Sequence, residues 1–168
     1  MFDRFLAKVY SKLFLSSNKV KEKNYRSRFN IHTTARFNYI ENTWLSGNIN
    51  IGANTYINTA RLVSGPNSQI RIGEWCAIGH NINIISWTHY KEDSTGIIEE
   101  KPLQEADINI GNHVWIGTNV FIKEGVNIGD DCIIAANSVI ISDVEKGAIV
   151  GGVPAKLISY KDKYEKNT

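Results

Sequence analysis

The sequence predicts an all-β fold, a solenoid of short parallel strands, and three observations lead to this prediction. Isoleucine recurs at every sixth residue, at Ile110, Ile116, Ile122, Ile128, Ile134 and Ile140. A smaller residue stands four positions after most of them, at Val114, Val120, Val126, Cys132 and Ser138. Glycine or alanine often follows the isoleucine directly, at Gly111, Gly117, Gly129 and Ala135. A helix turns by about 100° per residue and would scatter such a series around its axis, whereas extended chain keeps one parity on one face. Stacking such units builds a continuous core.

Residues 1–30 predict a basic helical arm ahead of the repeats. Apolar residues recur there at the spacing of one helical face, at Phe2, Phe5, Leu6, Val9, Leu13 and Phe14. Arg4, Lys8 and Lys12 lie off this face. Residues 18–30 are charged and aperiodic, which predicts a linker or a solvated coil. Two interpretations of the helix stay open: it packs on the solenoid or a neighbouring subunit, or it lies at a membrane surface and attracts anionic lipid.

The repeats predict a solenoid domain over residues 31–158, followed by a tail over residues 159–168. An earlier series runs through Leu45, Ile51, Ile57 and Val63, and after a break at "SGPNSQ" it resumes at Ile72, Ile78 and Ile84. Residues 86–107 then interrupt the period with polar, charged and aromatic chain. A long loop inside a compact repeat is usually functional, so we expect a protruding functional loop at residues 86–107.

Composition and charge exclude several classes of protein. The chain has 168 residues, 42% of them hydrophobic and 21% charged, as expected for one globular domain. Residues 1–30 carry eight Lys/Arg and two Asp/Glu, and the remainder carries eleven and fifteen. Because the body is mildly acidic, we expect no nucleic-acid partner. The start of the sequence lacks the apolar segment of a secretory signal, and no apolar run reaches the ~20 residues of a membrane span. We therefore expect a cytoplasmic location, at the inner membrane face if the arm binds lipid.

The two cysteines, Cys76 and Cys132, predict no disulfide framework. Both stand four residues after an isoleucine of the series, so both are expected to point into the core. Buried thiols at such positions behave as small core residues. We therefore expect no covalent nucleophile and a direct transfer reaction.

With these repeats and the segment "IVGGVPAKLI", the chain resembles the hexapeptide-repeat acyltransferases, in particular the maltose, galactoside and polysaccharide O-acetyltransferases. The resemblance covers roughly residues 40–158. It implies a left-handed parallel β-helix, acetyl-CoA as co-substrate, no metal, and a homotrimer with active sites between subunits.

The resemblance implies that His89 is the catalytic base, because the family's histidine lies near the start of the long loop. Here His89 follows two complete repeats that begin at Ile72 and Ile78. A sugar hydroxyl must lose its proton as it attacks a thioester, and an imidazole that is neutral near pH 7 is suited to accept it. His80 and His113 are interpreted as solvated turn residues.

By the same resemblance, three segments contact the acetyl-CoA: "VWIGTN", "IAANS" and "GGVPAK". They correspond here to Trp115, Gly117, Thr118, Ala135, Ala136, Pro154 and Lys156. Small side chains allow a cofactor to approach the backbone closely. The geometry of the corners is an equally good explanation for the glycine and the two alanines.

The acceptor-binding segment of the family has a counterpart in Tyr56-Ile57-Asn58, and Asp93 in the loop is a further candidate for binding the acceptor. We expect the acceptor to be a sugar hydroxyl. The family's maltose and galactoside members begin with an acidic helical cap, and this chain begins with a basic arm. This difference favours a nucleotide- or lipid-linked sugar of surface polysaccharide synthesis.

Four other functions remain as alternatives. An N-acetyltransferase of an amino sugar and a xenobiotic acetyltransferase would use the same fold. A zinc carbonic anhydrase of this fold would need three converging imidazoles, and His80, His89 and His113 are widely spaced. A solenoid scaffold would keep the fold without the chemistry.

Overall fold

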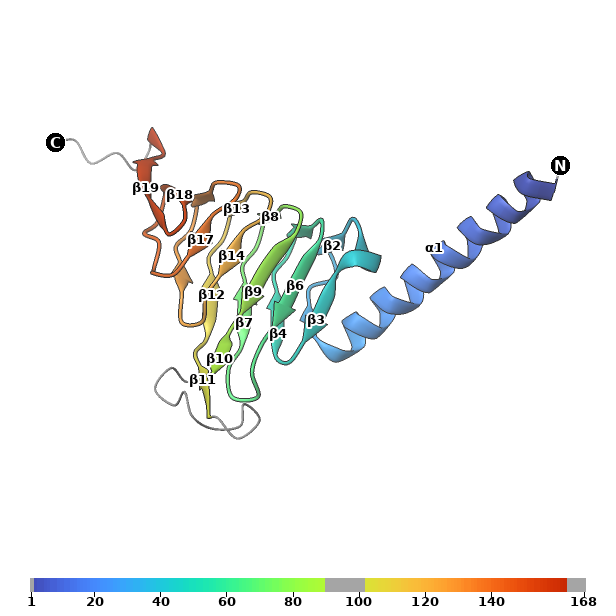
Figure 1. Ribbon diagram of the computed structural model, residues 1–168, viewed down its shortest axis with the longest axis horizontal. Coiled ribbons are helices and arrows are strands. Elements are labelled where there is room, and N and C mark those ends of the chain that lie inside the picture. The colour runs from blue at the N-terminus through green and yellow to red at the C-terminus, as the bar shows by residue number, and fades with distance from the viewer. Residues whose placement is uncertain (1, 90–101, 163–168) are drawn as a thin grey trace.

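Short parallel strands of the computed structural model form the three walls of a solenoid (Figure 1). The structure describes residues 2–89 and 102–162. The first sheet contains β1 (Asn30–Ile31), β4 (Ile49–Ile51), β7 (Ile70–Ile72), β12 (Ile108–Ile110) and β15 (Asn127–Ile128). The second contains β2 (Arg36–Phe37), β5 (Tyr56–Ile57), β8 (Ala77–Ile78), β13 (Trp115–Ile116), β16 (Ile133–Ile134), β18 (Ala148–Gly152) and β19 (Ala155–Tyr160). The third contains β3 (Trp44–Ser46), β6 (Ala60–Val63), β9 (Ile82–Ile85), β14 (Phe121–Ile122) and β17 (Val139–Ile140).

The chain visits the first, second and third sheets in turn and then begins the next coil. Equivalent residues of successive coils pair in register, as Ile110 does with Ile72 and with Ile128. The coils that contain Ile110 and Ile128 are 18 residues apart in the sequence, which is three six-residue units. The sixfold period is therefore one side of a three-sided coil.

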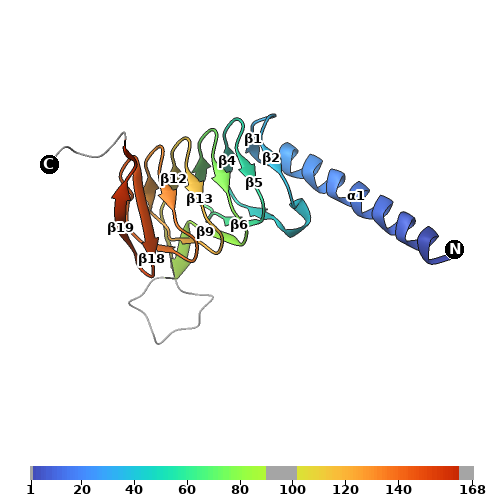
Figure 2. The ribbon, with the colours of Figure 1, turned by 90° about the horizontal axis from the view of Figure 1, so that it is seen from above.

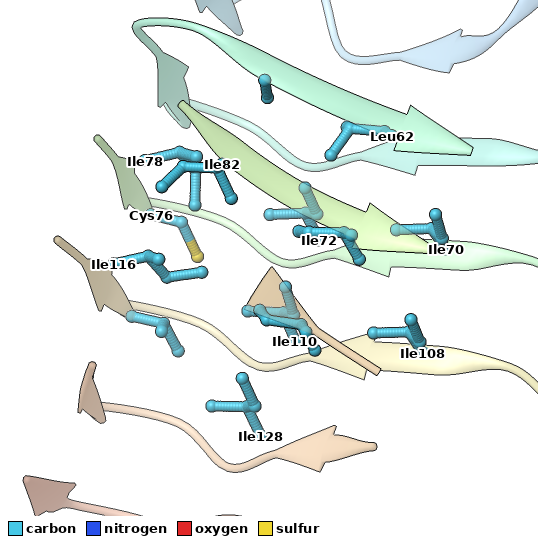
Figure 3. Close-up of a cluster of buried hydrophobic side chains, with 14 of the residues drawn as sticks. Leu62, Ile70, Ile72, Cys76, Ile78, Ile82, Ile108, Ile110, Ile116 and Ile128 are labelled. Atoms are coloured by element: carbon cyan, nitrogen blue, oxygen red, sulfur yellow. The ribbon is translucent and has the colours of Figure 1, made fainter. Parts of the chain in front are cut away.

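The interior consists of aliphatic columns that run from coil to coil (Figure 3). The six isoleucines from Ile110 to Ile140 are each at most 3% exposed. Cys76 and Cys132 also lie inside, as predicted, and both are free thiols. Burial of one aliphatic side chain is worth roughly 1.5–3 kcal/mol, so these columns supply the main driving force for folding.

The earlier six-residue series, predicted to run from Ile57 to Val63, loses its phase before Val63. Leu62 is fully buried, while Val63 is half-buried. Ile57 and Ala60 are both buried, so only Asn58 and Thr59 form this corner. The corner between Ile78 and Ile82 has three residues. The six-residue period therefore changes phase at the Asn58–Thr59 corner, which is one corner before the "SGPNSQ" segment.

The helix α1 (Phe2–Arg28) extends from the N-terminal end of the solenoid (Figures 1 and 2). The predicted linker or coil at residues 18–30 is thus wrong, since helix continues to Arg28. Its last turns contact the solenoid: the Tyr25 hydroxyl donates to the Thr43 carbonyl at 2.9 Å, and Lys21 Nζ donates to the Glu41 carbonyl at 3.1 Å. The contact is close to a short 3₁₀ helix, η1 (Ile40–Asn42).

Among the described residues, no helix has the length and apolar character needed to cross a membrane.

Two hairpins depart from the parallel pattern. β10 (Trp87–His89) pairs antiparallel with β11 (Leu103–Glu105) where the repeat is interrupted. β18 pairs antiparallel with β19 at the C-terminal end of the solenoid. The first hairpin is the described part of the predicted loop at residues 86–107, because residues 90–101 lie outside the described chain.

Candidate functional site

A groove of about 520 Å³ runs along the second sheet and its corner with the third sheet. Its lining combines small residues, aromatic rings and aliphatic side chains: Tyr56, Asn58, Ala77, Gly79, His80, Trp115, Ile116, Gly117, Thr118, Ile133, Ile134, Ala135 and Ala136. A shallow groove with small residues at its base fits an extended ligand that lies along the stack of coils.

The floor of the groove follows from the stacking of equivalent corners. Ile78 pairs with Ile116, and Ile116 pairs with Ile134. The two residues after each isoleucine therefore form a column of small corner residues. A Cβ on Gly117 would lie 2.6 Å from the Ala136 backbone nitrogen, so only glycine fits there. Coil stacking alone thus explains Gly117, and the open groove is a consequence of that stacking.

Ala135 occupies the position equivalent to Gly117 in the next coil. It is tolerated because the coil beyond it carries Gly151, where an added Cβ would lie 2.9 Å from the Ala135 Cβ. Small residues thus continue to the C-terminal end of the groove.

Most of the residues predicted to bind acetyl-CoA or the acceptor come together in this groove. They are Trp115, Gly117, Thr118, Ala135 and Ala136 from the first set, and Tyr56 and Asn58 from the second. Trp115 is 56% exposed and presents its ring at the surface of the second sheet. Asn58 accepts a hydrogen bond from Asn38 Nδ2 at 2.7 Å.

His80 is a groove residue that the sequence analysis missed. It is exposed at a corner, as predicted, but it also lines the groove, and its ring centroid lies 5.3 Å from that of Tyr39. Alignment of the coils would have found it, since His80, Thr118 and Ala136 each stand two residues after a paired isoleucine.

Pro154 and Lys156 lie outside the groove lining. Both are exposed, Pro154 in the turn between β18 and β19 and Lys156 in β19. Lys156 lines a separate hollow of about 240 Å³ with Tyr160 and Glu145. However, Val150 in β18 pairs with Ile134. The turn between β18 and β19 therefore continues the column of small corner residues beyond Ala136.

His89 is not among the residues that line the groove. It ends β10, pairs with Leu103 in β11, and is exposed. Its ring makes an edge contact with Trp87, with centroids 5.7 Å apart. The hairpin begins after β9 of the third sheet and returns to β12 of the first sheet, whereas the groove lies on the second. Asp93 lies outside the described residues.

Neither cysteine is placed to act as a nucleophile. Burial raises the pKa of both thiols. The Cys76 thiol donates to the Gly111 carbonyl at 3.1 Å, and the Cys132 thiol donates to the Glu145 carbonyl at 3.0 Å. A thiol that stays protonated in the core is inert.

A larger and more open hollow, of about 860 Å³, lies on the first sheet. Its polar side chains bond to one another from coil to coil: Asn30 donates to Asn50 and Asn109 donates to Asn127, both at 2.8 Å. We assign these contacts to coil stacking. No group of three His, Cys, Asp or Glu within residues 2–89 and 102–162 is arranged to hold a metal ion.

Comparison with known proteins identifies the repeat. Residues 107–142 match the family model described as bacterial transferase hexapeptide, six repeats. The acetyl-CoA complex of a hexapeptide-repeat-containing acetyltransferase from Vibrio cholerae superposes with a TM-score of 0.60 at 29% identity, over 80% of this chain and 69% of that one. Residues 107–142 therefore carry a hexapeptide repeat, and the fold is that of a hexapeptide-repeat acetyltransferase. The predicted left-handed parallel β-helix of this hexapeptide-repeat protein is thereby confirmed.

Two curated relatives resemble this hexapeptide-repeat protein. The galactoside O-acetyltransferase of Escherichia coli K12 is 32% identical over 129 residues, which are 70% of this chain and 61% of the relative. A protein named "Probable macrolide acetyltransferase" from Lysinibacillus sphaericus is 38% identical over 115 residues, 58% of this chain and 63% of the relative. The chain thus spans about three fifths of the length of these relatives.

Proposed function

We propose that the protein is an acetyl-CoA-dependent O-acetyltransferase that acts on a sugar hydroxyl. The observation that carries this proposal is the single groove that gathers Trp115, Gly117, Thr118, Ala135, Ala136, Tyr56 and Asn58. The galactoside O-acetyltransferase among its relatives supports the sugar acceptor, and the acetyl-CoA complex of the Vibrio cholerae protein supports the co-substrate.

The residues of the groove fit an extended thioester co-substrate. Its floor is made of glycine and alanine, which leave room for a narrow chain along the coils. Trp115 offers an exposed ring, and Pro154 and Lys156 would meet the far end of the same ligand. Acetyl-CoA supplies an activated acyl group, and the protein supplies position, the exclusion of water and a proton acceptor.

His89 is the proposed general base. As the sugar oxygen bonds to the acyl carbon, its proton passes to the imidazole, and the carbon–sulfur bond breaks. The proton then passes from His89 to the departing thiolate, so that no covalent enzyme intermediate forms. General-base catalysis of this kind contributes typically ~10²–10⁴-fold.

Tyr56 and Asn58 are proposed to bind the acceptor, and Asp93 is a third candidate. Both described residues are half-buried in the groove, where a phenol and an amide can each bond to a sugar hydroxyl. We further propose that the sugar is nucleotide- or lipid-linked and belongs to surface polysaccharide synthesis in the cytoplasm.

A homotrimer is proposed because, within one chain, the proposed base His89 and the groove lie on different sides of the solenoid. His89 projects on the hairpin between the third and first sheets, and the groove lies on the second sheet. An active site between two subunits would bring the hairpin of one subunit to the groove of the next.

The test measures thiol release from acetyl-CoA with a panel of free, nucleotide-linked and lipid-linked sugars. His89→Gln is expected to reduce kcat/KM by about 100-fold or more, because only the proton acceptor is lost. His113→Asn is the matched control, since His113 is an exposed corner residue whose φ of 57° suits asparagine. Undiminished turnover by His89→Gln would remove the histidine from this role.

Acetylation of a xenobiotic is the second candidate, and the macrolide acetyltransferase relative favours it. Adding a macrolide and an amino sugar to the panel separates xenobiotic acetylation and N-acetylation from sugar O-acetylation. Thiol release with none of the acceptors would favour a scaffold, and stoichiometric zinc in the purified protein would reopen the carbonic anhydrase alternative.

A further inference from the structure

The N-terminal half of α1 carries large apolar side chains that contact nothing else in the described chain. Every side chain from Arg4 to Ser17 is exposed, including Phe5 (62%), Tyr10 (70%) and Leu13 (65%). In both views the helix runs away from the solenoid (Figures 1 and 2). A continuous apolar face of this kind marks an interaction surface.

The apolar face is wide and has a cationic stripe beside it. At about 100° per residue, Phe5, Leu6, Val9, Leu13 and Val20 fall within an arc of about 100°. Tyr10 and Phe14 widen this arc to about 180°, with Leu15 outside it. The cations occupy the next ~80° of the helix surface: Arg4, Lys8, Lys12 and Lys19. No acidic residue occurs between residues 4 and 20.

This combination fits a lipid surface better than a second copy of the helix. A coiled-coil seam uses a narrow stripe and would leave Tyr10 and Phe14 exposed. It would also bring equivalent rows of cations close together without acidic partners. An anionic membrane surface accepts both features, because the apolar face enters the headgroup–acyl boundary while the cations meet lipid phosphates.

We propose that residues 4–20 of α1 form an interfacial helix that binds membranes containing anionic lipid and lies parallel to their surface. The last turns fix this helix to the solenoid. Arg26 Nη2 donates to the Ala35 carbonyl at 2.6 Å, and the Tyr25 ring packs against Phe29 and Phe37. Bound lipid therefore orients the whole solenoid. The proposal is independent of the proposed acetyl transfer.

Sedimentation of the full chain with vesicles tests the proposal. We expect binding to phosphatidylcholine vesicles that contain phosphatidylglycerol, weak binding to phosphatidylcholine alone, and weaker binding as salt rises. Leu13→Glu and the pair Lys8→Gln/Lys12→Gln are each expected to lower the partition coefficient about tenfold or more. Arg36→Gln/Arg61→Gln is the charge-matched control, because both arginines are exposed on the solenoid.

The thermal midpoint of each helix variant is expected to match that of the wild type, because the changed helix residues do not contact the solenoid. Equal binding to both vesicle types, or equal loss in the solenoid control, would overturn the proposal. The proposal would also be overturned if the protein did not bind vesicles and instead formed an oligomer that Leu13→Glu dissociates. That last result would assign the apolar face to contacts between copies of the chain.

Discussion

At the scale of the residue, Asn119 shows how one side chain supports a corner. Its φ of 59° lies in the left-handed region, which asparagine and glycine tolerate and alanine does not. Its side chain also links the coils, accepting from Asn81 Nδ2 at 2.9 Å and donating to Asn137 Oδ1 at 3.0 Å. Asn119→Ala should therefore lower the free energy of unfolding by about 1–2 kcal/mol more than Asn119→Gly. Urea denaturation of the two variants measures the difference. Equal losses would mean that only the side-chain ladder matters.

Asp130 makes stability depend on pH. Its Oδ1 accepts the Asn112 backbone N–H at 2.8 Å, and its Oδ2 lies 3.4 Å from Lys146 Nζ. The Asn112 N–H, helped by Lys146, holds the pKa of this carboxyl below its usual range. Because the pKa is lower in the folded state, the carboxylate stabilises the protein above the pKa of the unfolded chain. This contribution is lost as the pH falls through the folded pKa.

Asp130→Asn should remove this contribution while keeping the bond to Asn112. The equivalent residue one coil earlier is already an asparagine, and Asn112 Oδ1 accepts the Glu74 N–H at 2.8 Å. We expect the variant to lose about 0.5 kcal/mol near pH 7, a small amount because solvent screens the half-exposed side chain. At pH 3 the gap between the two proteins should be smaller than at pH 7. A gap that stays constant across urea titrations at both pH values would contradict the linkage.

At the scale of the element, the turn after β14 contains the ion pair Lys123–Glu124. The Glu124 side chain is only 4% exposed, and its Oε1 has no hydrogen-bond partner in the described chain. The Lys123 ammonium lies 2.5 Å from that oxygen and compensates its charge without the alignment of a hydrogen bond. The preceding coil places Ser86 at the equivalent position, where its hydroxyl lies 2.7 Å from that of Ser68.

Lys123→Met should lower the free energy of unfolding by about 1–3 kcal/mol, because it leaves a buried carboxylate without compensation. Adding Glu124→Gln removes that charge and should restore part of the loss. The coupling energy from a double-mutant cycle in urea measures the pair. Additive losses would show that the carboxylate reaches solvent in solution.

The strands were predictable because their signal is periodic and repeats with each coil. Every isoleucine of the series from Ile110 to Ile140 is buried, as its parity required. The register near Val63 was not predictable, because the corner at Asn58 and Thr59 is one residue shorter than the corner after Ile78, and this difference does not show in the residue composition. The helix between residues 18 and 28 was missed for another reason. Its contacts recur at Asn18, Lys21 and Tyr25, but polar residues at that spacing do not form an apolar stripe.

At the scale of the whole molecule, the two ends of the solenoid are closed in different ways. Tyr25 and Phe29 of the N-terminal segment are buried against the first coils, and the β18–β19 hairpin adds an antiparallel strand at the other end of the second sheet. Repeat proteins need such caps because their terminal coils would otherwise expose the core. The groove itself is a property of several coils, so a linear sequence showed its residues but not His80 among them.

The proposed trimer makes a prediction that a single chain cannot test. His89→Gln removes the proposed base, and Ala136→Trp fills the groove at an exposed position without changing the core. Each variant alone should lose most of its activity, by about 100-fold or more for His89→Gln. If the site lies between subunits, a mixed trimer of the two variants always contains one interface where both halves are intact.

Coexpression with two different tags and tandem purification isolates these mixed trimers. We expect about one third of the wild-type activity, because one of three interfaces in the closed ring is complete. Light scattering checks that each variant has three times the 18.9 kDa mass of one chain. Inactive mixed trimers would mean that His89 and the groove act within the same subunit. In that case the hairpin would have to reach the groove of its own solenoid across the third or the first sheet, which separate the two in the structure.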